Sequence, residues 1–127
     1  MAKVLVVEDN AANMTLATFL LQSAGHVVLS VKDAESGLAV ARVEQPDLVL
    51  MDIQLPGMDG LEATALLKSD PSTRLIPVIA LTALAMKGDE QRILAAGCDG
   101  YIAKPLAYKE FLATISALLL RVAPLHG

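Results

Sequence analysis

The chain has 127 residues, which corresponds to one domain with room for a substantial hydrophobic core. Apolar residues make up 54% and aromatic residues only 3%, a composition typical of helices packed on a buried sheet and poor in side chains that stack on nucleic-acid bases. Acidic residues outnumber basic ones by 14 to 10 and no basic block occurs, so nucleic acid is not expected as a partner. No apolar run is long enough for a membrane span and no signal peptide is recognisable, and the single Cys98 fits a reducing cytoplasm.

The first half of the chain is predicted to alternate strands with helices. Leu16, Leu20 and Leu21 are expected on the inner face of the first helix. Gly25 is suited to end that helix, and Asp33 is suited to cap the next one. The predicted elements are a strand at 3–7, a helix at 11–24, a strand at 27–31, a helix at 34–43 and, after Pro46, a central strand that ends in the lone carboxylate of Asp52.

The second half continues the alternation. The Asp59-Gly60 pair is also a hairpin signal, but the apolar residues that follow keep helical spacing, so a loop leading into a helix is preferred. Thr82 is expected at the end of the fourth strand, and Lys104 directly after the fifth. The predicted elements are a helix from 61 to about 69, a strand at 76–81, a helix at 87–96, a strand at 100–103 and a helix at 108–122.

Five strand–helix units predict an open α/β fold and not a barrel, since a barrel needs eight units and about 250 residues. We expect a flavodoxin-like (βα)5 doubly wound parallel sheet with strand order 2-1-3-4-5. The expected domain is a single one over residues 1–127, with its core at about 3–122.

The strand ends carry the polar residues of interest. Glu8 and Asp9 follow the first predicted strand, and Asp52, Thr82 and Lys104 end or follow the third, fourth and fifth. This fold would bring all five residues to one edge of the sheet. Three clustered carboxylates favour a shared cation, and Mg²⁺ suits oxygen ligands that leave room for water and phosphate. A cation, an ammonium and a hydroxyl around one carboxylate are typical of a phosphoryl-transfer site, with Asp52 as the covalent acceptor.

Four segments give a resemblance that covers nearly the whole chain. They are VVEDN at 6–10, MDIQLPGMDG at 51–60, ALTA at 80–83 and YIAKP at 101–105. Together they resemble the receiver domains of response regulators. MDIQLP, AMKGDE at 85–90 and GCDGYIAKPL at 97–106 are also similar to single-domain response regulators of the DivK type.

The resemblance implies a role for each site residue. Asp52 would accept a phosphoryl group, and Lys104 and Thr82 would bind its oxygens. Asp9, Asp52 and the backbone carbonyl of Gln54 would bind Mg²⁺ (or Mn²⁺) directly, and Glu8 would bind it through water. Thr82 and Tyr101 would form a switch, and the peptide bond before Pro105 would be cis. Gln54 and the apolar Leu84 occupy the two variable positions that affect the rate of phosphoryl loss in this family, which implies slow to moderate self-dephosphorylation.

The resemblance also implies a signalling role. The chain would be a two-component response regulator that takes the phosphoryl group from a sensor histidine kinase or histidine phosphotransfer protein, through a first helix that exposes Ala12 and Asn13. Its output face, formed by 87–96, 100–103 and 108–122, would bind a downstream protein. It would be no enzyme beyond self-phosphorylation and autodephosphorylation. We expect a cytoplasmic monomer or weak dimer with no nucleic-acid or membrane partner.

Three other functions would each require particular residues that can be looked for in the sequence. A Toprim-type metal nuclease needs an Asp-x-Asp pair, whereas this chain has Asp52-Ile53-Gln54. A flavin module needs a phosphate-binding loop after the first strand, where Glu8 and Asp9 stand instead. A degenerate receiver acting only as a binding module would not need all five site residues. Taken alone, Tyr101 could be a packed aromatic, and Cys98 a small buried side chain.

Overall fold

The computed structural model describes residues 2–83 and 87–122, in which five strands alternate with five helices. The elements are β1 (Lys3–Val7), α1 (Ala11–Ser23), β2 (Val27–Val31), α2 (Ala34–Glu44), β3 (Leu48–Asp52), α3 (Gly60–Ser69), β4 (Val78–Thr82), α4 (Lys87–Ala95), β5 (Gly100–Ala103) and α5 (Tyr108–Val122). Among these described residues, no helix is both long and apolar enough to cross a membrane.

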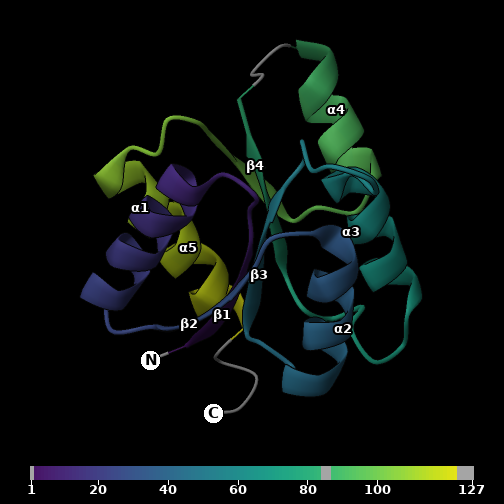
Figure 1. Ribbon diagram of the computed structural model, residues 1–127, viewed down its shortest axis with the longest axis horizontal. Coiled ribbons are helices and arrows are strands. Elements are labelled where there is room, and N and C mark those ends of the chain that lie inside the picture. Colours follow the sequence, from purple (N-terminus) through teal and green to yellow (C-terminus); the bar gives the residue numbers. More distant parts are fainter. Residues whose placement is uncertain (1, 84–86, 123–127) are drawn as a thin grey trace.

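The strands form one parallel sheet in the order β2-β1-β3-β4-β5. This confirms the predicted flavodoxin-like fold: β2 is added on one side of β1, whereas β3, β4 and β5 are added on the other, so the strand order reverses between β1 and β3. Helices α1 and α5 cover one face of the sheet, and α2, α3 and α4 cover the other (Figure 1). The carboxyl ends of all five strands therefore lie along one edge of the sheet.

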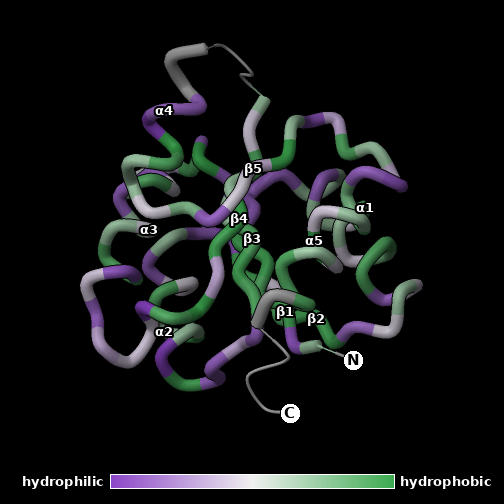
Figure 2. The backbone as a smooth tube through the Cα atoms, turned by 180° about the vertical axis from the view of Figure 1, so that it is seen from behind, coloured by the Kyte–Doolittle hydropathy of each residue, from purple (hydrophilic) through white to green (hydrophobic). Residues whose placement is uncertain are grey.

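The sheet separates two hydrophobic cores because successive side chains of a strand point to opposite faces. In β1, Val4 and Val6 face the α1/α5 core, whereas Leu5 and Val7 face the α2/α3 core. The central strands β1, β3 and β4 are hydrophobic nearly throughout (Figure 2). Every residue of β3 is buried, which makes this strand a rigid support for Asp52 at its end.

Helices α1, α2 and α3 each begin with a side-chain cap. The side-chain oxygens of Asn10, Asp33 and Asp59 accept hydrogen bonds from the backbone amides three residues later, at 2.9, 2.8 and 2.8 Å. These caps satisfy amides that have no partner within the helix. Gly25, with φ of +88°, follows α1 in the left-handed conformation that glycine adopts without strain.

The boundary of β4 differs from the prediction. The strand begins at Val78 and not at residue 76, since the Ile76 amide instead donates to the Thr73 carbonyl in a turn. Pro77 has no amide hydrogen and contributes only its carbonyl, which accepts from Val49 at 2.9 Å. At the other end, Thr82 lies within β4 as its last residue.

The predicted inner face of α1 was wrong at one position. Leu20 and Leu21 are buried, but the third buried position is Ala17, and Leu16 is 38% exposed beside an exposed Phe19. Helix α1 has no charged residue, so the spacing of its apolar residues does not distinguish its inner face from its outer one.

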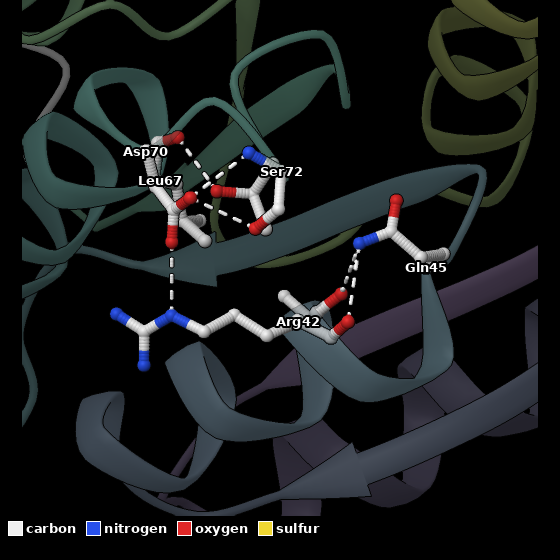
Figure 3. Close-up of polar contacts among 7 residues, drawn as sticks. Arg42, Gln45, Leu67, Asp70 and Ser72 are labelled. Atoms are coloured by element: carbon white, nitrogen blue, oxygen red, sulfur yellow. Dashed lines mark hydrogen bonds and ion pairs between the residues drawn. The ribbon is translucent and has the colours of Figure 1, made fainter.

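A surface ion pair connects α2 to the end of α3. Arg42 Nε lies 3.0 Å from Asp70 Oδ2, and Asp70 Oδ1 accepts from both the amide and the hydroxyl of Ser72 (Figure 3). Hydrogen bonds from Ser72 and then from Arg42 lower the pKa of Asp70. This corner lies at the end of the sheet where β4 begins, opposite to the strand ends that carry the acids.

Candidate functional site

The carboxyl ends of four strands supply the candidate site. Glu8 and Asp9 directly follow β1, Asp52 and Thr82 are the last residues of β3 and β4, and Lys104 follows β5. Because the strands are parallel and adjacent, these residues share one edge of the sheet although they are distant in sequence. Glu8, Asp52 and Thr82 are buried, whereas Asp9 is exposed.

The three carboxylates form one cluster with an ammonium beside it. Glu8, Asp9 and Asp52 each offer an oxygen that lies within 4.8 Å of the others. The Lys104 ammonium lies 2.8 Å from Glu8 Oε1 and 3.1 Å from Asp52 Oδ2, so one cation contacts both buried acids. Glu8 Oε1 makes no hydrogen bond of ordinary geometry despite this contact.

Backbone amides orient the two buried carboxylates. Asn10 N donates to Glu8 Oε2 at 3.2 Å, and Gln54 N donates to Asp52 Oδ1 at 2.9 Å. Gly60 lies against the same strand end, where an added Cβ would stand 2.1 Å from the Asp52 carbonyl oxygen. No role was predicted for Asn10 or Gly60 from the sequence, although an Asn before a helix is a recognisable N-cap signal.

The electrostatics of the cluster show in two pKa shifts. Burial, followed by contact with Asp52, raises the pKa of the Glu8 carboxyl. Burial alone would lower the pKa of Lys104, but its close contacts with the Glu8 and Asp52 carboxylates outweigh that effect and raise it. The cluster therefore carries excess negative charge that an additional cation would stabilise.

A cleft opens over these groups toward α1. Its lining comes from the acids and Lys104, from the start of α1, and from the loops after β3 and β4: Glu8, Asp9, Asn10, Ala11, Asn13, Asp52, Gln54, Ala83 and Lys104. The Lys104–Pro105 peptide bond is cis. Leu84, predicted to affect the lifetime of a phosphoryl group, lies outside the described residues.

Thr82 and Tyr101 lie on neighbouring strands but differ in exposure. Thr82 is buried at the end of β4, whereas the Tyr101 side chain on β5 is 37% exposed and so points away from the cores. The negative charge of Glu90, together with burial and a hydrogen bond to that carboxylate, raises the pKa of the Tyr101 hydroxyl. Tyr101 is thus associated with α4 in this structure.

The chemistry of the cleft follows from these groups. Three clustered oxygen ligands, one of them on an exposed residue, suit a hard divalent cation that keeps part of its water shell. A buried carboxylate held by an amide, with an ammonium and a hydroxyl nearby, suits the transfer of an anionic group to that carboxylate.

Comparisons with known proteins agree with this arrangement. A family model for the response regulator receiver domain matches residues 4–116. The chain is 48% identical over 116 residues to the polar-differentiation response regulator DivK of Brucella anthropi, covering 91% of this chain and 94% of that protein, and equally so to DivK of Brucella ovis.

Solved structures give the same result. The receiver domain of the sensor histidine kinase PA1611 from Pseudomonas aeruginosa PAO1, solved with a magnesium ion in its active-site cleft, is 36% identical with a TM-score of 0.87 over 93% of this chain and 97% of that one. The chemotaxis protein CheY4 of Vibrio cholerae is 28% identical with a TM-score of 0.88, over 93% of this chain and 98% of that one.

Proposed function

The chain belongs to the response regulator receiver domain family of two-component systems, and we propose that Asp52 is its phosphoacceptor. In this proposal the phosphoryl group comes from a phosphohistidine on a histidine kinase or phosphotransfer protein. The observation that carries it is the single ammonium of Lys104 in contact with buried Asp52 and Glu8, at the edge where five strand ends meet.

The residues present fit a divalent cation. The three carboxylates offer oxygens within 4.8 Å of one another, and the buried Glu8 Oε1 has the Lys104 ammonium at 2.8 Å but no hydrogen bond of ordinary geometry. We propose that Asp9, Asp52 and the carbonyl of Gln54 hold Mg²⁺ or Mn²⁺ directly and that Glu8 holds it through water. When bound, the cation offsets negative charge on the phosphoryl oxygens.

The protein's own groups position the reaction. The Gln54 amide fixes Asp52 Oδ1, which orients the carboxylate toward the cleft. An oxygen of Asp52 forms a bond to phosphorus as the bond from phosphorus to the donor's histidine nitrogen breaks. Lys104 then pairs with one phosphoryl oxygen and the Thr82 hydroxyl donates to another, so that both stabilise the charge of the product. Catalysis is limited to the chain's own phosphorylation and dephosphorylation, the latter slow to moderate.

The outer face of α1 is the proposed contact for the donor protein. Ala11, Ala12, Thr15, Leu16 and Phe19 line a shallow, largely apolar depression next to the cleft. Asn13, from the same helix, lines the cleft itself. A donor protein bound to this face would thus place its phosphohistidine at the opening of the cleft that contains Asp52.

The proposed output face is formed by α4, β5 and α5. Drawing Thr82 toward a phosphoryl group would leave space for Tyr101 to turn inward, away from Glu90, and would bias a two-state equilibrium of this face toward the form that binds a downstream protein. We further propose a cytoplasmic protein in which residues 1–127 form one receiver domain, monomeric or weakly dimeric.

Intact-mass measurement tests the proposed function. Incubation with acetyl phosphate and Mg²⁺ should add one phosphoryl group per chain, and the gain should be absent in Asp52→Asn or with EDTA. Asp47→Asn, on an exposed residue at the opposite end of β3, is the matched control and should be labelled like the parent protein. Labelling that persists in Asp52→Asn would contradict Asp52 as the acceptor.

A further inference from the structure

A polar cluster at the far end of the sheet holds the start of β5. Lys68 Nζ, on α3, donates to the carbonyl of Ile76 at 2.8 Å and more weakly to that of Arg74 at 3.4 Å. The same ammonium lies 2.9 Å from Asp99 Oδ2, just before β5. The three donors of one ammonium thus join α3, the loop before β4 and the start of β5.

Asp99 is bonded on both sides to one residue of β4. Its Oδ2 accepts from Val78 N at 2.8 Å, and its own amide donates to Val78 O at 2.7 Å. Gly97 lets the Lys68 stem pass closely, since a Cβ there would stand 2.9 Å from Lys68 Cγ. Asp99 can therefore reach Val78 and Lys68 together in only one alignment of β5 along β4.

The strand that follows needs such a constraint. β5 has four residues and lies at the edge of the sheet, so that in the described part of the chain β4 is the one strand beside it. A shift of one residue would move it by about 3.3 Å and reverse the faces to which its side chains point. Lys104 follows directly, with its amide bonded to Thr82 O at 2.7 Å and its ammonium on Asp52 and Glu8.

We infer that Lys68 and Asp99 are positioning residues that fix the register of β5 on β4 and thereby place the Lys104 ammonium in the cleft. They touch none of the reacting groups and act from the opposite end of a short edge strand. The geometric part of this inference is independent of the proposed function, and its kinetic consequence rests on that function.

Amide hydrogen exchange tests the geometric part. In Lys68→Met the Lys104 amide should exchange about tenfold faster or more. The reason is that the charged hydrogen bond that holds Asp99, and with it β5, is lost, so β5 separates from β4 more often. The Ile53 amide, which donates to Leu81 O in the centre of the sheet, should keep its rate. Lys68→Arg should restore slow exchange. Arg42→Met, which removes the ion pair between α2 and Asp70, is the matched control and should leave the exchange rate of the Lys104 amide unchanged.

A double-mutant cycle tests the kinetic part. Lys68→Met should slow phosphoryl uptake from acetyl phosphate about tenfold, since small misplacements of a catalytic group have large effects on rate. In a Lys104→Met background the same substitution should have no further effect, because it acts through that ammonium. Mg²⁺ affinity, which depends on groups after β1 and β3, should stay at the parent value.

Two results would overturn the inference. The first is an unchanged hydrogen-exchange rate of the Lys104 amide in Lys68→Met. The second is that Lys68→Met slows phosphoryl uptake equally with and without the Lys104 ammonium, which is what a general loss of stability would produce. A parent protein that takes up no phosphoryl group would instead contradict the proposed function, and the exchange rates alone would then decide the inference.

Discussion

The ammonium of Lys104 neutralises part of a buried acidic pair. Glu8 and Asp52 are 1% and 3% exposed, and each has an oxygen within 3.1 Å of Lys104 Nζ. Burial, followed by the proximity of Asp52, raises the pKa of the Glu8 carboxyl. The stability of the apo protein should therefore depend on this one side chain.

Replacing Lys104 by Met tests that dependence. In EDTA the free energy of unfolding should fall by about 3 kcal/mol, since removing one partner leaves buried charge uncompensated. Mg²⁺ should recover part of this loss, because a bound cation stabilises the folded state. Lys3→Met, which removes an exposed ion pair to Glu44, should cost about 1 kcal/mol or less. Equal losses in the two variants, measured by urea unfolding, would contradict this account.

His26 should make the stability depend on pH. Its Nδ1 accepts a hydrogen bond from Ala2 N at 3.2 Å, and burial lowers the pKa of its imidazole below the ordinary 6.5. As the pH falls, His26 therefore takes up a proton in the unfolded state before it does so in the folded state. The stability that neutral His26 contributes is complete above pH 6.5 and is lost as the pH falls through the folded pKa. His26→Gln should flatten the dependence of unfolding free energy on pH between about 7 and 5. An unchanged slope in that variant would rule out His26 as its source.

Helix α1 combines a buried face with an exposed face that is almost equally apolar. Ala17, Leu20 and Leu21 pack in the core, but Leu16 and Phe19 are 38% and 64% exposed. No charged residue occurs anywhere in the helix, which is unusual for a helix covering a sheet. Apolar side chains on the exposed face lower solubility and do not stabilise the fold by burial, which supports a role of this face in binding a partner.

Substituting Phe19 should separate docking from chemistry. Phe19→Ser should leave labelling by acetyl phosphate unchanged and alter the unfolding free energy by about 0.5 kcal/mol or less, because the side chain is mostly exposed. Transfer from a phosphohistidine donor protein should slow by about tenfold or more, as expected for an aromatic residue within an interface. Val43→Ser, on an exposed apolar residue of α2, is the matched control. Equal transfer rates in both variants would exclude the α1 face as the docking site.

The fold was predictable because each level of the sequence agreed. Apolar runs marked the strands, Gly25 and Asp33 marked the end of one helix and the start of the next, and the parallel arrangement then determined which strand ends meet. What could not be predicted depends on how particular segments turn and pack in three dimensions. The start of β4 depends on a turn at Thr73 and Ile76, and the outward direction of Leu16 depends on which face of an uncharged helix meets the sheet.

The candidate site was predictable for a related reason. Glu8, Asp9, Asp52, Thr82 and Lys104 are polar residues at the ends of apolar strands, so their convergence follows from topology alone. Their distances do not follow from it. The contact of one ammonium with two acids, the support of Asp52 by Gly60 and Gln54, and the connection from Lys68 through Asp99 to β5 depend on side-chain geometry that no local pattern encodes.

The location of the phosphoryl group decides whether the whole arrangement works as an acceptor site. After labelling with acetyl phosphate and Mg²⁺, borohydride should reduce an aspartyl phosphate to homoserine, and peptide sequencing by mass spectrometry should find this residue at position 52. Homoserine at position 52 in the parent protein, and at no position in samples labelled with EDTA present, is the predicted result. Homoserine at another aspartate, or a label that borohydride leaves in place on a serine, threonine or histidine, would contradict it.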